Sequence, residues 1–418
     1  MKKLTKKTNG RKTDSKQLER FAAEVDFARE SRIQMIQQLI PLGLMAVEEE
    51  LQGEILELAG PRYSRGGELK RWGANPGSVF VGDQKLRINV PRLRDVVRGR
   101  EVELSSYGRL QSPGQVDEAA FRRVINGISS GRYEQAAEHV PETFGISKSS
   151  VSRKFIRASA KRLEEFLARD LSRYDIVAIF IDGKHFQEHE IVTALGITTA
   201  GEKILLGFAE TSTENHKVCR EFLLGLKARG LKLDQEILFI VDGGKGLKKG
   251  IAEAAGGKAV LARCQWHKRE NVVSYLSKER QDEFRGRLQA AYEEPGYEAA
   301  KAALLAIRRE LARINQSAAA SLDEGLEETL TLHKLGLFEK LGKSFKTTNC
   351  IEGVHKQLAR FTDRVDRWQN SDQRRRWVAS AFLEIEPGLN RVWGYEHLKE
   401  LRKAMKKLVA KQKMENAA

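Results

Sequence analysis

The chain has 418 residues, 41% of them apolar, so it is long enough to bury several cores, and we expect two to four domains. Its 73 lysine and arginine residues outnumber 57 acidic residues, and the net charge of +16 favours a polyanionic partner, nucleic acid before an anionic membrane. No apolar run approaches the roughly 20 residues that span a bilayer, the polar first 16 residues lack a signal-peptide core, and three scattered cysteines exclude a disulfide framework. We therefore expect a soluble, cytoplasmic protein that binds nucleic acid.

The amino-terminal quarter is predicted to contain a tail, helices and a small sheet. Residues 1–20 carry eight basic and two acidic side chains without periodicity, which indicates a flexible basic tail. Within 21–115, apolar residues recur every three or four positions up to Ala59, as in helices. Short alternating stretches at 85–90 and 101–104 then indicate a small β element.

Residues 116–170 are helical in pattern and contain a segment, 133–156, that resembles a helix-turn-helix. Two adjacent alanines permit a close helix crossing, Gly145 supplies the turn, and Ser147 is suited to cap a second helix. The alternative is an ordinary helical hairpin with a solvated basic face. The polar side chains of the second helix are the predicted DNA contacts: Lys148, Ser149, Ser152, Arg153 and Lys154.

From residue 171 the pattern changes to strands. Successive strands and helices are predicted at 176–181, 190–199, 203–211, 215–229, 236–241, 247–255 and 259–263, in the order βββαβαβ. This order predicts an α/β, ribonuclease H-like catalytic domain over 171–269 and 345–375. Residues 270–344, rich in charge, alanine and leucine, are predicted to form a helical insertion, and 376–418 a basic helical C-terminal region.

Two aspartates follow apolar strands and precede glycine. Asp182 ends the run IVAIFID, and Asp242 ends ILFIVD. Carboxylates at strand ends lie at the rim of a sheet, where hydrated metal and phosphate have room. Phosphodiester chemistry uses carboxylates to hold two divalent ions about 3.5–4 Å apart. Either aspartate alone is more often only a turn residue.

The third predicted ligand is Glu352, on a helix that follows the insertion. Asn349, His355 and Lys356 share its face by their three- and four-residue spacing, so they are suited to touch phosphate oxygens. A glutamate on a helix is more often a solvated charge. The order of the three acids along the predicted sheet and helix favours one metal site made of Asp182, Asp242 and Glu352.

Other polar clusters flank these acids. Cys264 and His267 have the spacing of half a zinc site, but no second pair lies near them, so we expect the pair to pack and orient the site instead. His185 and His189 lie between two predicted strands and are at most substrate contacts. Three lysines after Asp242 fit backbone phosphates or, equally, a solvated face. They are Lys245, Lys248 and Lys249.

The chain resembles the Mutator-type transposases encoded by bacterial insertion sequences. The resemblance is carried by FIDGKHF, FIVDGGKGL, RCQWHKREN and TTNCIEGVHKQLAR, and it spans most of the chain. It implies that Asp182, Asp242 and Glu352 are the catalytic DDE triad and that Cys264 and His267 are the family's Cys-x-x-His pair. It further implies dependence on Mg²⁺ or Mn²⁺, recognition of terminal inverted repeats in double-stranded DNA, transfer into target DNA, and a homo-oligomer that joins two DNA ends.

These observations predict a nucleoid-associated DDE transposase that cleaves DNA strands at the inverted repeats of an insertion sequence and transfers them. Two alternatives remain open at this point. One is a nonenzymatic DNA-binding regulator that uses the sheet as a scaffold. The other is a ribonuclease H-fold nuclease acting on RNA or on structured junctions.

Overall fold

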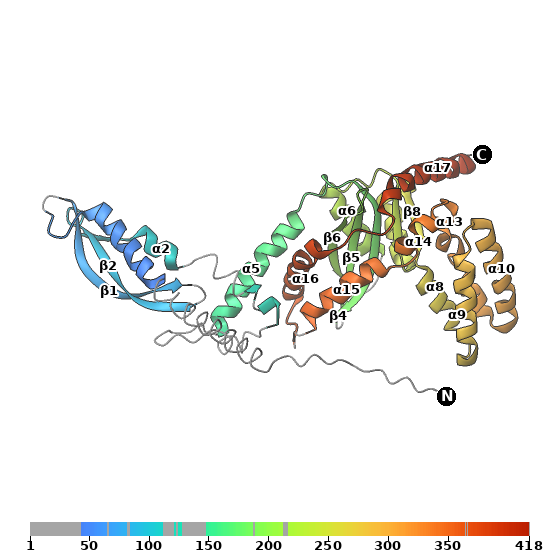
Figure 1. Ribbon diagram of the computed structural model, residues 1–418, viewed down its shortest axis with the longest axis horizontal. Coiled ribbons are helices and arrows are strands. Elements are labelled where there is room, and N and C mark those ends of the chain that lie inside the picture. The colour runs from blue at the N-terminus through green and yellow to red at the C-terminus, as the bar shows by residue number, and fades with distance from the viewer. Residues whose placement is uncertain are drawn as a thin grey trace, which may run out of the picture. The chain divides into compact units, whose positions relative to one another are not determined.

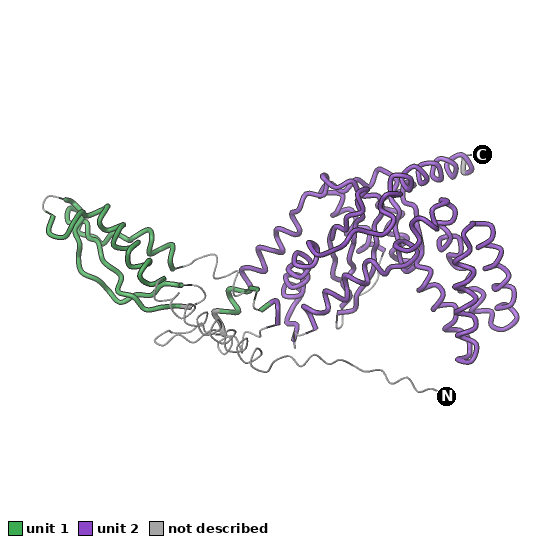
Figure 2. Tube along the Cα trace, in the orientation of Figure 1, with its two compact units in different colours: residues 1–124, 128–155 green, residues 125–127, 156–418 purple. Residues whose placement is uncertain are grey.

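The computed structural model describes residues 43–64, 67–81, 84–111, 121–122, 124–127, 148–186, 189–211, 216–363, 365 and 367–417. It divides into two compact units, residues 1–124 with 128–155 and residues 125–127 with 156–418 (Figure 2). The predicted basic tail and residues 133–147 of the predicted helix-turn-helix lie outside the described residues. The predicted domain boundaries near residues 115 and 170 stay predictions.

Unit 1 is a three-stranded antiparallel sheet with helices on one face. Its strands are β1 (Leu69–Val81), β2 (Gln84–Asp95) and β3 (Arg100–Val102), in the order β1-β2-β3. A helix described over residues 43–59 and α2 (Ser105–Gln111) supply the cover. Val47, Leu51 and Ile55 of the first helix pack with Val79 and Ile88 of the sheet in one buried cluster. The hydrophobic effect on this one face holds the unit together.

The hairpin of β1 and β2 is longer than the sequence indicated. The sequence indicated β structure only in short stretches at 85–90 and 101–104, but β1 begins at Leu69 and includes Gly73, Pro76 and Gly77. A shift in the register between Arg71 and Ala74 accommodates Gly73, whose φ of +85° an L side chain rarely adopts. The bulge therefore lets a strand pass through residues that normally end one.

Unit 2 is built on a five-stranded mixed sheet in the order β6-β5-β4-β7-β8 (Figure 1). The strand β5 is antiparallel to both of its neighbours, β4 and β6, whereas β7 and β8 run parallel to β4. The bounds are β4 (Ile176–Phe186), β5 (His189–Thr198), β6 (Lys203–Thr211), β7 (Ile237–Val241) and β8 (Ala259–Arg263). The predicted succession of strands and helices is confirmed.

Helices cover both faces of this sheet, which is why its central strands are continuous apolar runs. On one face lie α6 (His216–Ala228) and α7 (Lys245–Ala255), whose buried side chains include Cys219, Leu223 and Ile251. The other face is packed by helices from both ends of unit 2, and their apolar residues form one cluster with it. These are α5 (Lys148–Ala168), α14 (Phe338–Phe345), α15 (Asn349–Thr362), α16 (Ser371–Ile385) and α17 (Leu398–Ala417).

Between β8 and α14 the chain is helical, as predicted for the insertion. The helices are α8 (Gln265–Val273), α9 (Lys278–Glu293), α10 (Tyr297–Ile314), α11 (Gln316–Asp323), α12 (Leu326–Thr329) and α13 (Thr331–Lys334). Short 3₁₀ turns occur at Gly256–Lys258, Glu386–Gly388 and Tyr395–His397. Phe284, Leu288, Leu304 and Leu311 belong to a separate buried cluster, so the insertion has its own core. In the part of the chain that the structure describes, no helix is both long and apolar enough to cross a membrane.

Candidate active site

The register of the parallel strands brings the two aspartates together. Phe180 of β4 lies opposite Ile240 of β7, and continuing this register by two residues sets Asp182 beside Asp242. On the other side of β7, Val241 lies opposite Arg263 of β8. The amide of Cys264 donates to the Val241 carbonyl at 2.8 Å. Asp242 and Cys264 therefore follow the carboxyl-terminal ends of β7 and β8, and Asp182 lies at the same level on β4.

The prediction that Asp182 ends its strand is wrong. β4 continues to Phe186 because β5 keeps pairing with it, and Asp182 lies opposite Thr193. Only the pairing with β7 has ended by that point, since β7 stops at Val241. On the β7 side the main chain of Asp182 therefore has no strand pairing, and the Asp182 side chain is 12% exposed.

Asp242 begins the turn that leaves β7. Its Oδ1 accepts the Gly244 amide at 3.1 Å, and its carbonyl accepts from Arg263 Nε at 3.3 Å. Gly243 has a φ of +111°, and a Cβ there would stand 2.0 Å from Arg263 Nε. Glycine is required here both by conformation and by the buried guanidinium beside it. The Asp-Gly pair is thus a tight turn that also fixes the carboxylate.

Glu352 lies in the first turn of α15, where buried Thr348 holds it. The Thr348 hydroxyl donates to Glu352 Oε1 at 2.7 Å. The Thr348 hydroxyl oxygen also lies 3.3 Å from His267 Nδ1 and 3.5 Å from Cys264 Sγ. One turn further along α15, His355 Nδ1 is 3.5 Å from Asp182 Oδ2, and Lys184 donates to the His355 carbonyl at 3.0 Å. Helix α15 thus contacts both the Cys/His pair and β4.

Cys264 and His267 form an ionisable pair between the acids. A hydrogen bond with Cys264 raises the pKa of His267 to about 9 against the effect of burial, and the charges of Asp182 and Glu352 raise it further. Burial raises the pKa of the Cys264 thiol, but hydrogen bonds with His267 and Thr348 outweigh burial and hold that pKa below its usual value. His267 is therefore a cation at neutral pH under the influence of two predicted metal ligands.

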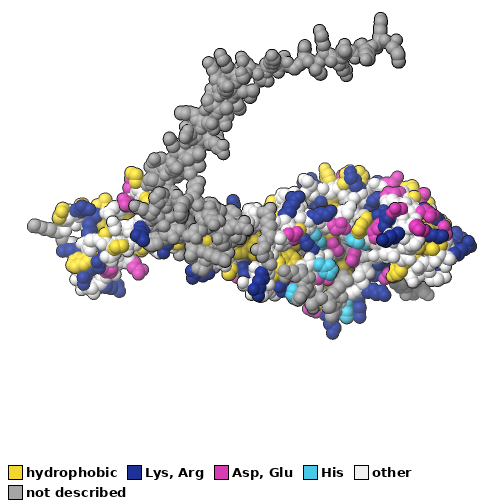
Figure 3. Space-filling view, turned by 90° about the horizontal axis from the view of Figure 1, so that it is seen from below, with side chains coloured by type: hydrophobic (Ala, Val, Ile, Leu, Met, Phe, Trp, Pro, Cys, Tyr) yellow, Lys and Arg dark blue, Asp and Glu magenta, His cyan; other side chains and the backbone are white. Residues whose placement is uncertain are grey.

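Among the described residues, no three His, Cys, Asp or Glu side chains are placed to hold a metal ion as they stand. Asp182 faces His355, and Glu352 faces Thr348. Oxygen donors of this kind suit Mg²⁺ or Mn²⁺, so the chemistry of the donor set fits such an ion. Their present contacts are with protein donors. Histidine and acidic side chains gather near the middle of one face of unit 2 (Figure 3).

The flanking predicted residues have separate surroundings. Asn349 and Lys356 are exposed on α15. His185 is exposed on β4, whereas His189 Nδ1 lies 3.4 Å from Glu210 Oε1 on the neighbouring β6. The contact with Glu210 links His189 to the edge strand β6. His189 was predicted to be at most a substrate contact, and this pairing within the sheet is an alternative role for it.

Two lysines predicted to contact phosphates are engaged within the protein. Lys154 is 7% exposed, and its Nζ lies 4.5 Å from the centre of the Phe80 ring. Lys248 Nζ forms a 2.6 Å ion pair with Glu328 of α12. Helical periodicity placed both on a polar face, but tertiary neighbours cover them. Lys245, Lys249 and Arg153 are exposed, Ser152 is half-buried, and the side chains of Lys148 and Ser149 lie outside the described residues.

Sequence reasoning missed Thr348, Lys184 and Arg263. Thr348 precedes a helix and is the type of residue that caps one, but its hydroxyl donates four residues along to Glu352 instead. Lys184 and Arg263 stand in the motifs around Asp182 and Cys264, and this adjacency was the available signal.

Comparison with known proteins identifies the family. The model of the family described as "Transposase, Mutator family" matches residues 10–387. The chain belongs to this family. Among its relatives is the transposase for insertion sequence element ISRM5 of Rhizobium meliloti, 25% identical over 69% of this chain and 72% of the relative. That for IS406 of Burkholderia multivorans is 24% identical over 75% and 81%. That for IS256 in transposon Tn4001 of Staphylococcus aureus is 23% identical over 72% and 77%. The recognised family resemblance is confirmed.

Proposed function

We propose that this Mutator-family transposase is a DDE enzyme with a ribonuclease H-like catalytic domain, cleaving DNA at the terminal inverted repeats of an insertion sequence and transferring the cut strands. The order and directions of the five strands support the domain assignment. The register that juxtaposes Asp182 and Asp242 carries the catalytic proposal, because two carboxylates on one open sheet edge suit phosphodiester chemistry.

Asp182, Asp242 and Glu352 are the proposed ligands of Mg²⁺ or Mn²⁺. Bound divalent ions would activate the attacking oxygen and stabilise the leaving one during in-line displacement at phosphorus. The electrostatic effect of both Asp182 and Glu352 on His267 supports their proximity. Binding requires each carboxylate to exchange its protein donor for the ion.

The other side chains at the site are positioning residues in this proposal. Thr348 holds the Glu352 carboxylate and connects it to the Cys264–His267 pair. His355, whose carbonyl accepts from Lys184, faces the Asp182 carboxylate. The cationic His267 lowers the repulsion between the two acids while no metal is bound. The chain's own residues thus hold the carboxylates in position.

The substrates are proposed to be double-stranded DNA with the element's terminal repeats and a target duplex, with a homo-oligomer bringing two ends together. Such a protein would act on nucleoid DNA in the cytoplasm. The net charge of +16 supports a DNA partner. Exposed Lys245 and Lys249 on α7, which begins just after Asp242, are suited to contact phosphates next to the acids.

The test is strand transfer by purified protein on repeat-ended duplexes with Mg²⁺ or Mn²⁺. Asp182→Asn, Asp242→Asn and Glu352→Gln preserve shape and remove the charge, so each should abolish cleavage and joining. Asp234→Asn is the matched control because this aspartate is exposed in the loop before β7, and it should keep wild-type activity. Full activity in any triad variant would refute the assignment of that residue.

A nonenzymatic regulator is the second candidate, favoured by one observation: no three potential ligands among the described residues are yet placed around a metal. Repeat binding that persists in EDTA, without cleavage under any Mg²⁺ or Mn²⁺ condition, would support this candidate. Cleavage that the triad variants abolish would exclude it.

A further inference from the structure

The unit 1 sheet is packed on one face by the helix of residues 43–59, whereas side chains on its other face, such as Trp72 and Arg87, are exposed. Val79, Ile88 and Leu93 belong to the cluster with the covering helix, so they define the packed face. Side chains alternate along a strand, and neighbouring positions in the antiparallel register share a face. Residues that alternate with these three along the strands, and the residues paired with them, therefore point away from the covering helix. We call the face that they form the outer face of unit 1.

The outer face is strongly basic. Its charged residues on the described strands comprise five bases and one acid: Lys70, Lys85, Arg87, Arg92, Arg94 and Glu101. Glu101 pairs with Arg92, and bases outnumber acids five to one among the described strand residues of this face. Trp72 lies on the same face with 47% of its surface exposed, and the Arg94 guanidinium lies 4.8 Å from its ring centre. A basic surface with an exposed aromatic is typical of nucleic-acid binding.

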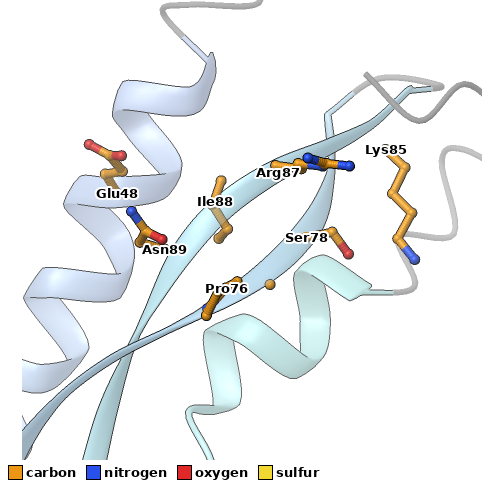
Figure 4. Close-up of a pocket in the computed structure, with 8 residues that line it drawn as sticks. Glu48, Pro76, Ser78, Lys85, Arg87, Ile88 and Asn89 are labelled. Carbon is orange, nitrogen blue, oxygen red and sulfur yellow. The ribbon is translucent and has the colours of Figure 1, made fainter. Parts of the chain in front are cut away.

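A surface hollow of about 740 Å³ lies over the distal half of the hairpin. Its polar lining comes from both strands and from the covering helix, with Ser78 on β1, Lys85, Arg87 and Asn89 on β2, and Glu48 on the helix (Figure 4). Ile88 of the packed face also lines it, so the hollow extends from the outer face around the side of the sheet. Ser78 lies opposite Arg87 in the register, so hydroxyl and guanidinium are cross-strand neighbours. These donors suit phosphate oxygens, which accept hydrogen bonds from lysine, arginine, serine and asparagine alike.

The outer face continues to the first turns of α5. The Phe80 ring, at the tip of the hairpin, lies 5.8 Å from Lys85 Nζ and 4.5 Å from Lys154 Nζ. Lys154 is on the helix that sequence analysis predicted to bind DNA, and exposed Arg153 is its neighbour. Lys154 itself is buried against Phe80, so in this part of unit 1 the helix adds only Arg153 as an exposed base among the described residues.

We propose that the outer face of unit 1 binds duplex DNA through its phosphates, with Lys85 and Arg87 as the main contacts. A two-stranded ribbon fits the roughly 12 Å width of the major groove. At about 3.3 Å per residue the 12-residue β2 extends about 40 Å, comparable to the roughly 34 Å of one DNA turn. Net positive charge and a single exposed tryptophan favour DNA over a protein partner or a membrane. The inference relies on the proposed function only for DNA as the partner.

The experiment measures binding of the full chain to an unrelated duplex and to the terminal repeat, in EDTA, over a range of salt. Each phosphate contact adds about 0.9 to the slope of log K against log salt. The double variant K85Q/R87Q should lower that slope by about 1.8 on both DNAs. R62Q/R109Q is the matched control, because it removes the same charge from exposed positions in the loop after the first helix and on α2.

Equal slopes for the two double variants would overturn the proposal, since only long-range charge would then be acting. A loss confined to the terminal repeat would overturn the phosphate contacts, because phosphates carry no sequence. Weaker binding of phosphatidylserine vesicles with DNA binding unchanged would assign the face to a membrane instead. Circular dichroism and melting temperature check that both variants fold. The binding assay contains EDTA and requires no catalysis. Its outcome is therefore independent of whether the triad variants lose strand transfer.

Discussion

Replacing Thr348 with valine tests whether the hydroxyl at the centre of the candidate site holds Glu352. Thr348 is completely buried, and its hydroxyl is 2.7 Å from Glu352 Oε1 and within 3.5 Å of His267 Nδ1 and Cys264 Sγ. Valine keeps the shape and removes the hydroxyl. A hydrogen bond to a charged group contributes about 1.5–3 kcal/mol, so the folding equilibrium constant should fall about 10- to 150-fold.

Urea denaturation measures this loss as a change in the free energy of unfolding. Thr347→Val is the matched control, because this half-buried hydroxyl accepts only a long 3.4 Å bond from the Asn349 amide, and its loss should cost less than about 0.5 kcal/mol. Thr348→Ser retains the hydroxyl and should recover strand-transfer activity that Thr348→Val loses under conditions where both are folded. Equal stability of the two valine variants would refute the reasoning.

Three further outcomes follow from buried polar groups. Arg263→Gln should lower the free energy of unfolding in urea by about 2–3 kcal/mol, because a guanidinium 4% exposed then leaves two main-chain carbonyls unpaired. Arg374→Ala should cost about 3–5 kcal/mol in the same assay, because buried Glu210 loses its arginine partner and keeps only Ser371 and His189. Burial lowers the pKa of Lys268 to about 8, so the unfolded chain binds the extra proton between pH 8 and 10.5. Stability relative to Lys268→Met should therefore rise with pH across that window, and a flat difference would contradict it.

The strands of unit 2 were predictable because each is a continuous apolar run bounded by glycine or charge. Burial on both faces selects such runs, and the parallel strands β7 and β8 contain them almost without interruption. The juxtaposition of Asp182 and Asp242 followed from the same logic, since each ends an apolar run and parallel strands align their ends. Local sequence was sufficient for these features.

The end of β4 was misjudged because an apolar run marks where burial ends and not where pairing ends. Beyond Asp182, the strand continues through Lys184 and His185 to Phe186, paired with β5 in antiparallel register. Backbone hydrogen bonds require no apolar side chain, so a half-exposed hairpin extends past the core. That extension explains how Lys184 comes to bind the His355 carbonyl on α15.

Contacts between segments that are distant in the chain could not be predicted from the sequence. Lys248 and Glu328 are 80 positions apart, and nothing local to either predicts their ion pair. Thr348 illustrates the same limit, because its role depends on the end of β8 meeting the start of α15. Periodicity identifies a polar face of a helix, but it does not identify what packs against that face.

The three acids are held by restraints of different strength. Asp182 and Asp242 are fixed by sheet register, and a slip of one residue would turn every side chain of a strand to the opposite face, so small perturbations do not separate them. Glu352 reaches the same end of the sheet only through α15. The start of this helix is set by the Thr348 contacts with Cys264 and His267 and by the hydrogen bond that the Gln265 main-chain amide donates to the Lys346 carbonyl. These contacts join α15 to the β8–α8 junction, where the helical insertion begins. Changes in the packing of the insertion should therefore move Glu352 while the register still keeps the two aspartates on adjacent strands.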